Sequence, residues 1–180
     1  AHAETTVDST VLANAVTVGG AVGEIAVAAP VINTTARAHL SDNAVVDAGG
    51  AVLIEALTDT TVSATADGIA AAAAIGTTTA IPVIAVTTEA FIEDAATIAG
   101  ATVIDVTATA TGTVTTTANS TPMGANLNPT TLATLGVATA AGPQTDAAAI
   151  AATTLTSNTR AFVDTSGALT ATGNVSVQAS

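Results

Sequence analysis

Serine, histidine and aspartate are the side chains of a hydrolase triad, and this sequence contains all three. Its two histidines are His2 and His39. A triad needs a histidine within hydrogen-bond reach of both a serine and a carboxylate. His2 lies at the start of the chain, and His39 occupies a position that phenylalanine takes in two related stretches. We therefore predict no catalytic residue and no enzymatic activity.

Metal and cofactor chemistry has few candidate ligands. Cysteine is absent, which excludes thiolate zinc sites and thiol nucleophiles. Carboxylates stand near turns in "SDNAVVD", "FIEDA" and "ALTDT", but their spacing is not that of a calcium-binding loop. We predict no cofactor. Calcium at a turn is the one cation left open, with solvated acids as the alternative.

The charge is strongly one-sided. The chain has 14 acidic residues and two basic ones, Arg37 and Arg160, for a net charge of −12. Nucleic acids and anionic membranes both attract clusters of Lys and Arg, so neither is predicted as a partner. The two arginines are expected either to form bidentate pairs with carboxylates along a wall of the fold or to remain solvated.

Three Asn-x-Ser/Thr sequences, at Asn33, Asn119 and Asn174, are candidate glycosylation sites. Chance matches are expected in a sequence so rich in Asn and Thr. The chain offers no run of about 20 strongly apolar residues of the kind that crosses a membrane, so no membrane insertion of the mature chain is predicted. It begins at Ala1 without Met, and any export signal is expected to have been removed or left out.

Threonine occupies every odd position from Thr107 to Thr117. In a β-strand, alternate side chains point to opposite faces, so this stretch predicts a threonine face and a face of small residues. The simplest interpretation is a solvated strand face, since Thr favours strands. The alternatives are a hydrogen-bonded threonine ladder at a subunit contact, an array that orders water, as in ice-binding proteins, and O-glycosylation of the hydroxyls.

A repeat underlies these features. Three segments align without a gap: "RAHLSDNAVVDAGGAVLIEA", "EAFIEDAATIAGATVIDVTA" and "RAFVDTSGALTATGNVSVQA". The scarcest residue types coincide, because Arg37 and Arg160 share one position while Phe91, Phe162 and His39 share another. Each copy shows a strand–turn–strand pattern, with Gly-rich corners before an alternating strand. The copies start 52 and 71 residues apart.

The architecture expected from this repeat is all-β. Apolar side chains are mostly small, with no Trp or Tyr and two Phe, which suits thin layers. We predict a parallel β-solenoid forming one repetitive domain over residues 1–180, with a loop-rich insertion over 119–146. At roughly 20–25 residues per coil, the chain would form about 7–9 rungs. Residues 67–76 and 145–155 are expected either as short Ala-rich helices or as strands of small residues. The alternative is a β-sandwich pilin completed by strand donation.

The quoted repeats, together with "TSNTRAFVDTSGALTATGNVSVQAS", resemble those of large bacterial surface proteins of the filamentous-haemagglutinin or adhesin type. In those proteins Thr-x-Ala-aromatic-aliphatic is followed by Gly-rich turns and Val-x-Val-x-Ala. The middle copy departs from this pattern, with Glu89 in the arginine position. The resemblance implies an exported, right-handed parallel β-helix that serves as a stalk or adhesive filament.

The final stretch, "GNVSVQAS", is repeat strand up to its last residue. An uncovered solenoid end exposes backbone donors and acceptors, so either the chain is a slice of a longer protein or another copy stacks on that end. Head-to-tail stacking that does not close gives a filament. We therefore predict an extracellular or cell-surface structural protein that partners copies of itself, with cell-surface or matrix components as further partners. A donor-strand pilin subunit and a ligand- or ice-binding module remain the alternatives.

Overall fold

A computed structural model describes residues 1–18, 23–71, 75–122 and 147–180. The chain forms thirteen strands in these ranges and no helix. The strands are β1 (His2–Val18), β2 (Gly23–Ala28), β3 (Val31–Leu40), β4 (Val45–Asp47), β5 (Val52–Ala71), β6 (Ile75–Ala80), β7 (Val83–Ile92), β8 (Thr97–Ala101), β9 (Ile104–Pro122), β10 (Ala147–Ala151), β11 (Thr154–Val163), β12 (Leu169–Ala171) and β13 (Val175–Ala179).

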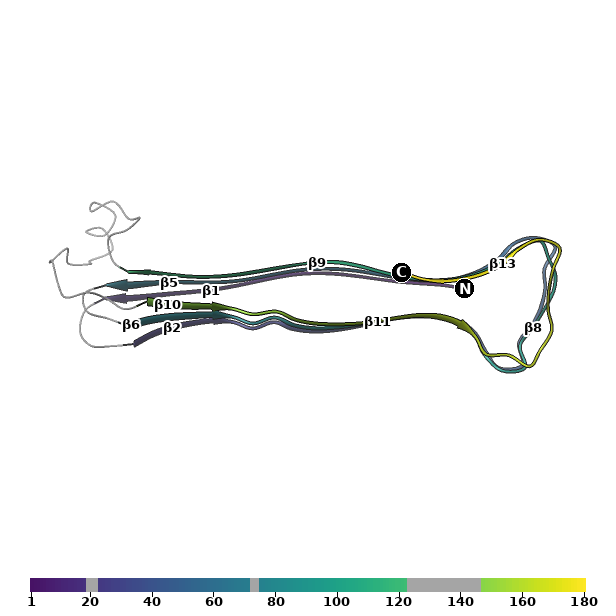
Figure 1. Ribbon diagram of the computed structural model, residues 1–180, viewed down its shortest axis with the longest axis horizontal. Coiled ribbons are helices and arrows are strands. Elements are labelled where there is room, and N and C mark those ends of the chain that lie inside the picture. The colour runs from purple at the N-terminus through teal and green to yellow at the C-terminus, as the bar shows by residue number, and fades with distance from the viewer. Residues whose placement is uncertain (19–22, 72–74, 123–146) are drawn as a thin grey trace.

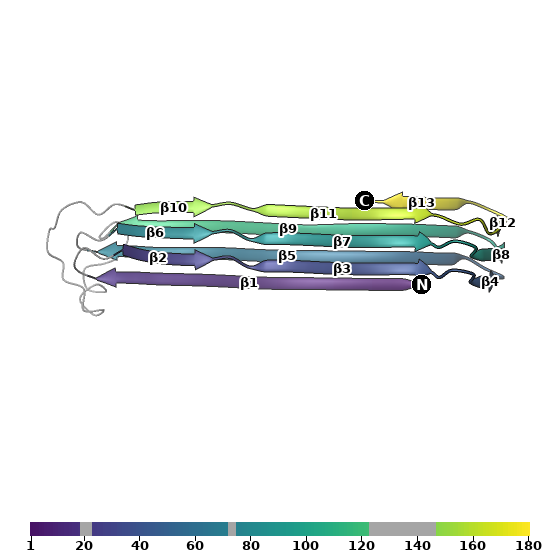
Figure 2. The ribbon, with the colours of Figure 1, turned by 90° about the horizontal axis from the view of Figure 1, so that it is seen from below.

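The strands stack into four sheets, with the orders β1-β5-β9-β13, β10-β6-β2, β11-β7-β3 and β12-β8-β4. Every pairing among them is parallel. The chain visits the sheets in the same sequence each time, and we call one such passage a circuit: β2 to β5, β6 to β9, and β10 to β13, with β1 preceding the first (Figure 2). This all-β arrangement is compatible with a β-solenoid. The parallel pairing also disfavours the alternative sandwich, whose sheets are antiparallel.

Figure 1 shows the circuits end on, as two long walls joined at one end by a broader bend. The first sheet forms one wall, and the sheets of β2 and β3 form the other. The sheet containing β8 closes the broad end. Each circuit therefore encloses a narrow interior along the walls and a wider one at the bend.

The repeat found in the sequence recurs once in each circuit. Val31 pairs with Val83 and Val83 with Thr154, so equivalent residues of neighbouring copies touch directly. The expectation of 20–25 residues per coil and 7–9 rungs was wrong, because the long walls place equivalent residues of the first two copies 52 residues apart. The offset changes to 71 between Pro122 and Ala147. The predicted insertion over 119–146 falls there. Its first residues belong to β9, and 123–146 lie outside the described residues.

Neither predicted helix is present in the described residues. Residues 67–71 end β5, Ile75 and Gly76 begin β6, and Ala147–Ala151 form β10. Residues 72–74 and 145–146 lie outside the described ranges. Alanine favours helix locally, but in-register parallel partners on neighbouring circuits satisfy these backbones as strands. Tertiary pairing therefore overrides intrinsic propensity.

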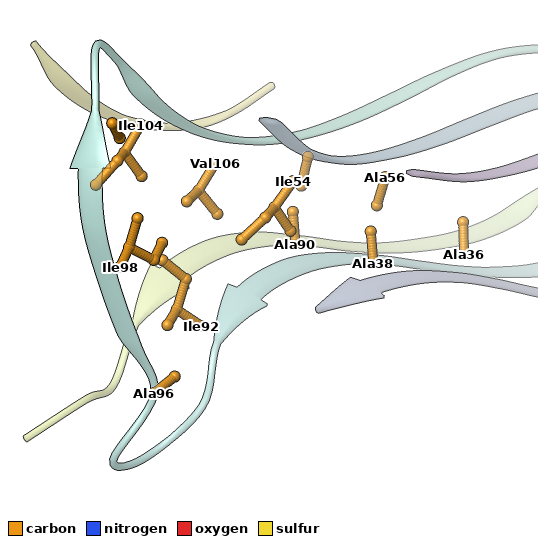
Figure 3. Close-up of a cluster of buried hydrophobic side chains, with 12 residues drawn as sticks. Ala36, Ala38, Ile54, Ala56, Ala90, Ile92, Ala96, Ile98, Ile104 and Val106 are labelled. Atoms are coloured by element: carbon orange, nitrogen blue, oxygen red, sulfur yellow. The ribbon is translucent and has the colours of Figure 1, made fainter. Parts of the chain in front are cut away.

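Side-chain size follows the width of the interior. In the close-up of Figure 3, Ile54, Ile92, Ile98, Ile104 and Val106 converge in the broad end, whereas alanines line the region where the walls approach. Those five side chains are at most 1% exposed. A second cluster along the walls consists of alanines alone: Ala26, Ala28, Ala64, Ala66 and Ala80. The thin-layer expectation is thus confirmed. The larger aliphatic cluster lies at the broad end, and a smaller one, Val62, Ile84 and Val86, lies along the walls.

Some buried threonines along the walls lack hydrogen-bond partners. Thr58 and Thr88 bond to each other across the interior at 2.8 Å, but the hydroxyls of Thr60 and Thr78 are buried without a partner. Removing an unsatisfied buried hydroxyl while keeping shape relieves its desolvation cost. We expect Thr78→Val to raise the free energy of unfolding by about 1 kcal/mol in urea denaturation. Thr88→Val, which leaves Thr58 without its partner, should lower it.

One corner carries local backbone strain. Asn43 and Ala95 both have positive φ, at 57° and 56°, and Asp42–Asn43 and Asp94–Ala95 begin equivalent turns of adjacent copies. Asparagine tolerates this left-handed conformation better than alanine. We expect Ala95→Asn to stabilise the protein by roughly 0.5–1 kcal/mol, measured as a rise in the urea midpoint. A fall would show that the larger side chain disturbs the neighbouring corner.

Candidate functional site

A column of three charged side chains crosses the stack. Arg37, Glu89 and Arg160 occupy the same position of β3, β7 and β11 and pair in register. The Arg37 Nε and Nη2 donate to Glu89 Oε2 at 3.0 and 2.7 Å. The Arg160 Nε donates to Glu89 Oε1 at 3.1 Å, and its Nη2 donates to the same oxygen. Each arginine thus donates two N–H groups to one oxygen of the shared carboxylate. We call this column the ladder.

A column of rings runs beside the ladder, two residues further along each strand. His39, Phe91 and Phe162 stack with centroids 5.2 and 4.9 Å apart and interplanar angles of 13° and 2°. The Arg37 Cζ lies 5.2 Å from the centroid of Phe91, and the Arg160 Cζ lies 5.3 Å from that of Phe162. Cation–π contacts of this kind add to the ion pairs. His39 is therefore a member of a ring stack, as its shared position with phenylalanine indicated.

Burial and charge act against each other on Glu89. Its side chain is 5% exposed, whereas those of Arg37 and Arg160 are 55% and 54% exposed. Burial alone would raise the pKa of Glu89, but the hydrogen bonds and positive charges of the two arginines outweigh it and hold the pKa below its ordinary value. The sequence-based interpretation overlooked Glu89 as their partner, because it appeared only as a departure from the repeat. The sequence does not show that the three copies are direct neighbours, and this is the information needed to pair Glu89 with the two arginines.

Acids elsewhere in the strands are also separated from one another. Asp59 lies between Thr6 and Thr111 in register, and its Oδ1 accepts a hydrogen bond from the Thr111 hydroxyl at 3.2 Å. Asp67 accepts one from the Asn119 amide at 2.8 Å. None of the described strand pairings places two acids opposite each other. Like charges directly opposite would be destabilising, so this spacing lets an acidic chain stack closely.

The threonine strip lies in β9 with its odd-numbered residues on the outer face. Ala108 is fully buried on the inner face, while Thr111, Thr113 and Thr115 are exposed. Threonines or serines also occupy neighbouring outer positions of β5, such as Thr61 opposite Thr113. The expected two-faced strand is confirmed. What the hydroxyls bind stays a prediction.

Both ends of the stack present strand edges. Within the described part of the chain, β1 pairs only with β5, and β9 pairs with β13 only near its start. The last contact there is the Ala110 N–H donating to the Ser180 carbonyl at 2.9 Å. Beyond it an open hollow of about 190 Å³ lies between β9 and β11, lined by Ala110, Gly112 and Leu155 among others. Leu155 is 55% exposed although its neighbour Ile84 in β7 is buried.

The hydrogen-bond alternation of these two edges is compatible. Ala1 of the β1 end bonds to β5 through both its amino group and its carbonyl, so even-numbered residues of β1 direct their backbone groups to the free edge. On β9, the Ala108 carbonyl and the Ala110 N–H both bond to Ser180, so even-numbered residues also face its free edge. Parallel pairing between them would satisfy both rows.

The remaining predicted sites do not form clusters. His2 contacts Glu4 and Glu55 at 3.6 and 3.2 Å at the exposed start of β1, with no serine hydroxyl bonded to its ring in the residues described. Asp94 accepts hydrogen bonds from Ser166 and from the Ala95 N–H, which lower its pKa and hold a corner of the stack together.

The metal and glycosylation candidates remain untested. Among the described residues, no group of three or more His, Cys, Asp or Glu side chains is placed to hold a metal ion. Asn33, Asn119 and Asn174 are exposed, and their glycosylation stays a prediction. No helix in the described ranges has the length and apolar character needed to span a membrane.

Comparison with known proteins finds no matching family model, no matching curated protein and no matching solved structure. The resemblance to adhesin repeats therefore remains a prediction from the quoted motifs.

Proposed function

We propose that this chain is a non-enzymatic β-solenoid subunit that stacks end to end on copies of itself, forming an extracellular filament or stalk. The observation that carries the proposal is the match between the free edges of β1 and β9. Both strands belong to the same parallel sheet. In both, the backbone N–H and C=O groups of even-numbered residues point to the free edge of the strand. The adhesin-like repeats support the extracellular placement.

The strand register between circuits of one chain also gives the register expected where a second copy is added. Val7 pairs with Thr60, and Thr60 pairs with Gly112. In a continued stack, Val7 of the next copy would lie opposite Gly112, where the hollow beside β9 leaves room for an inward side chain. Its β2 and β3 would then cover β10 and β11. The first residues of the incoming β1, up to Thr5, would move aside because β13 already occupies the equivalent positions.

Thr10 offers a direct test of this edge. It is exposed, and its N–H lies on the free edge of β1 by the alternation above. Proline is tolerated on an edge strand where the N–H faces solvent, but its ring blocks pairing there. We expect wild type to form elongated assemblies in negative-stain microscopy and sedimentation, and Thr10→Pro to remain short with an unchanged unfolding transition.

Thr10→Val is the matched control, because it keeps the N–H and should keep the assemblies. Isolated particles of wild type at all concentrations would contradict the proposal. Filaments that survive Thr10→Pro would show that copies join through another surface.

A second candidate function rests on the outer face of the first sheet. Threonines two residues apart on a strand are separated by about 6.6–6.8 Å, and adjacent strands by about 4.7–4.9 Å. The columns Thr10–Ser63–Thr115 and Thr61–Thr113 therefore form a small patch of regularly spaced hydroxyls, with Asp8 beside Thr61. Such a patch suits ordered water and would support ice binding. Thermal hysteresis lost on Thr113→Lys would support this function, and its absence in wild type would reject it.

A further inference from the structure

The charges of the ladder influence which partner binds at each end of the stack. This inference rests on the end-to-end stacking proposed above. Inside the chain the sign of the charge alternates from circuit to circuit, as Arg37, Glu89 and Arg160. Both outer members are arginines, and each directs its Nε and Nη2 inwards to the one carboxylate. Each guanidinium has five N–H donors, so donors remain at both ends, on side chains that are 55% and 54% exposed.

Stacking on an identical copy interrupts this alternation. Because β11 and β3 both pair with β7 in the same register, the join would place Arg160 of one copy beside Arg37 of the next. Every charge of the ladder inside the chain has an opposite charge as its neighbour, and none of the described strand pairings places two arginines opposite each other. Like charges directly opposite are unfavourable.

The ring column has no such conflict. At the same join Phe162 would meet His39, a pair of the kind already stacked as His39 and Phe91 within the chain. The rings therefore favour continuation in register, whereas the arginine position favours a carboxylate. β7 shows the combination that satisfies both demands, Glu89-Ala90-Phe91.

We propose that each end of this stack preferentially receives another parallel β-circuit whose edge strand carries an acid–any residue–aromatic sequence, as β7 does. The preferred partner is a different solenoid chain with a carboxylate at the ladder position, and stacking of identical copies is the weaker mode. The recognition chemistry is a charge-assisted guanidinium–carboxylate pair beside a continued ring stack.

A charge-inverted chain tests the preference. The triple variant Arg37→Glu, Glu89→Arg, Arg160→Glu keeps an alternating ladder but presents carboxylates at both ends. We expect a mixture of wild type and this variant to assemble at roughly a fivefold lower concentration than either alone, the factor that corresponds to the size of one cross-strand charge pair. Light scattering and sedimentation velocity report it. The advantage should shrink in about 1 M NaCl, where surface charges are screened.

The variant is more negative overall than wild type, so general repulsion is stronger in the mixture than in wild type alone. An enhancement over wild type therefore cannot come from net charge. Arg160→Gln provides a second arm if the triple variant does not fold. It removes the arginine–arginine contact at the join, while Arg37 still binds Glu89. The variant should therefore fold as wild type does and self-assemble more readily than wild type. If Arg160 serves only to hold β11 in place, Arg160→Gln should assemble less readily than wild type.

Stronger assembly of the mixture, or of Arg160→Gln, supports the preference. If wild type assembles as readily as the mixture and Arg160→Gln is unchanged or weaker, the preference is overturned and self-stacking stands. If neither wild type nor the mixture assembles, end-to-end stacking fails, and the preference fails with it.

Discussion

Replacing Glu89 with alanine is expected to lower the free energy of unfolding by about 2 kcal/mol. Removing one partner of a fully buried ion pair costs about 3–5 kcal/mol, but the arginines here are half exposed and water compensates part of the loss. The variant would leave Arg37 and Arg160 without their shared carboxylate on adjacent circuits. Urea denaturation followed by circular dichroism measures the change.

Asp8→Ala is the matched control for loss of one negative charge. Asp8 is exposed on β1 and lies opposite Thr61 in β5. Its removal should change the unfolding free energy by less than about 0.5 kcal/mol. Equal effects of the two substitutions would mean that net charge, rather than the ladder, controls stability.

The same carboxylate gives the stability a defined pH dependence. The arginines hold the pKa of Glu89 below its ordinary value of 4.5 in the folded protein. A group with a depressed folded pKa contributes stability that is present above its unfolded pKa and lost as pH falls through the folded one. The contribution of Glu89 should therefore be complete above about pH 5 and decline below 4.5.

Glu89→Gln isolates this contribution, since it keeps the shape but does not titrate. The difference in unfolding free energy between wild type and Glu89→Gln should be largest near neutral pH and shrink as the pH falls towards about 3. Relief of general repulsion on acidification affects both proteins and cancels in the difference. A difference that is constant with pH would contradict the assigned role of the ion pairs.

The repeat positions were the part of the fold that sequence predicted best. Arg37 and Arg160, and the three rings beside them, align because each copy lies directly on the next at one strand spacing. The length of a circuit was not predictable in the same way. A long wall of alternating Thr and Ala, such as β9, shows the same period-two pattern wherever the chain turns. Hydrophobic periodicity therefore does not show where one strand ends and the next begins.

The site illustrates the same limit. Glu89 stands where the other two aligned copies have arginine. From the alignment alone, this difference looks like the loss of the arginine. Once the copies are known to be neighbours, a change of sign at one position becomes the complement of its two neighbours. The helix predictions failed for a related reason, since Ala-rich segments such as Ala147–Ala151 are helical by propensity but pair in register, as strands, with a strand of the neighbouring circuit.

Ile98→Ala is expected to lower the free energy of unfolding by about 2–5 kcal/mol, more than the loss of Glu89. Ile98 lies on β8 and is fully buried in the broad end, where it faces Ile92, Ile104 and Val106 (Figure 3). The rigid stacking of three circuits prevents the bend from collapsing around the space left by the missing atoms. Cavity formation therefore adds to the lost transfer free energy.

Two further substitutions establish that the space at the bend matters. Ile98→Val removes one methylene and should cost only about 0.5–1.5 kcal/mol, while Val62→Ala on the narrow wall should cost less than Ile98→Ala because Val62 belongs to a smaller cluster. Urea midpoints of the three variants give the order directly. If Val62→Ala is the more damaging change, the stack is held together chiefly by its thin walls, and the aliphatic cluster at the bend serves to turn the chain rather than to stabilise it.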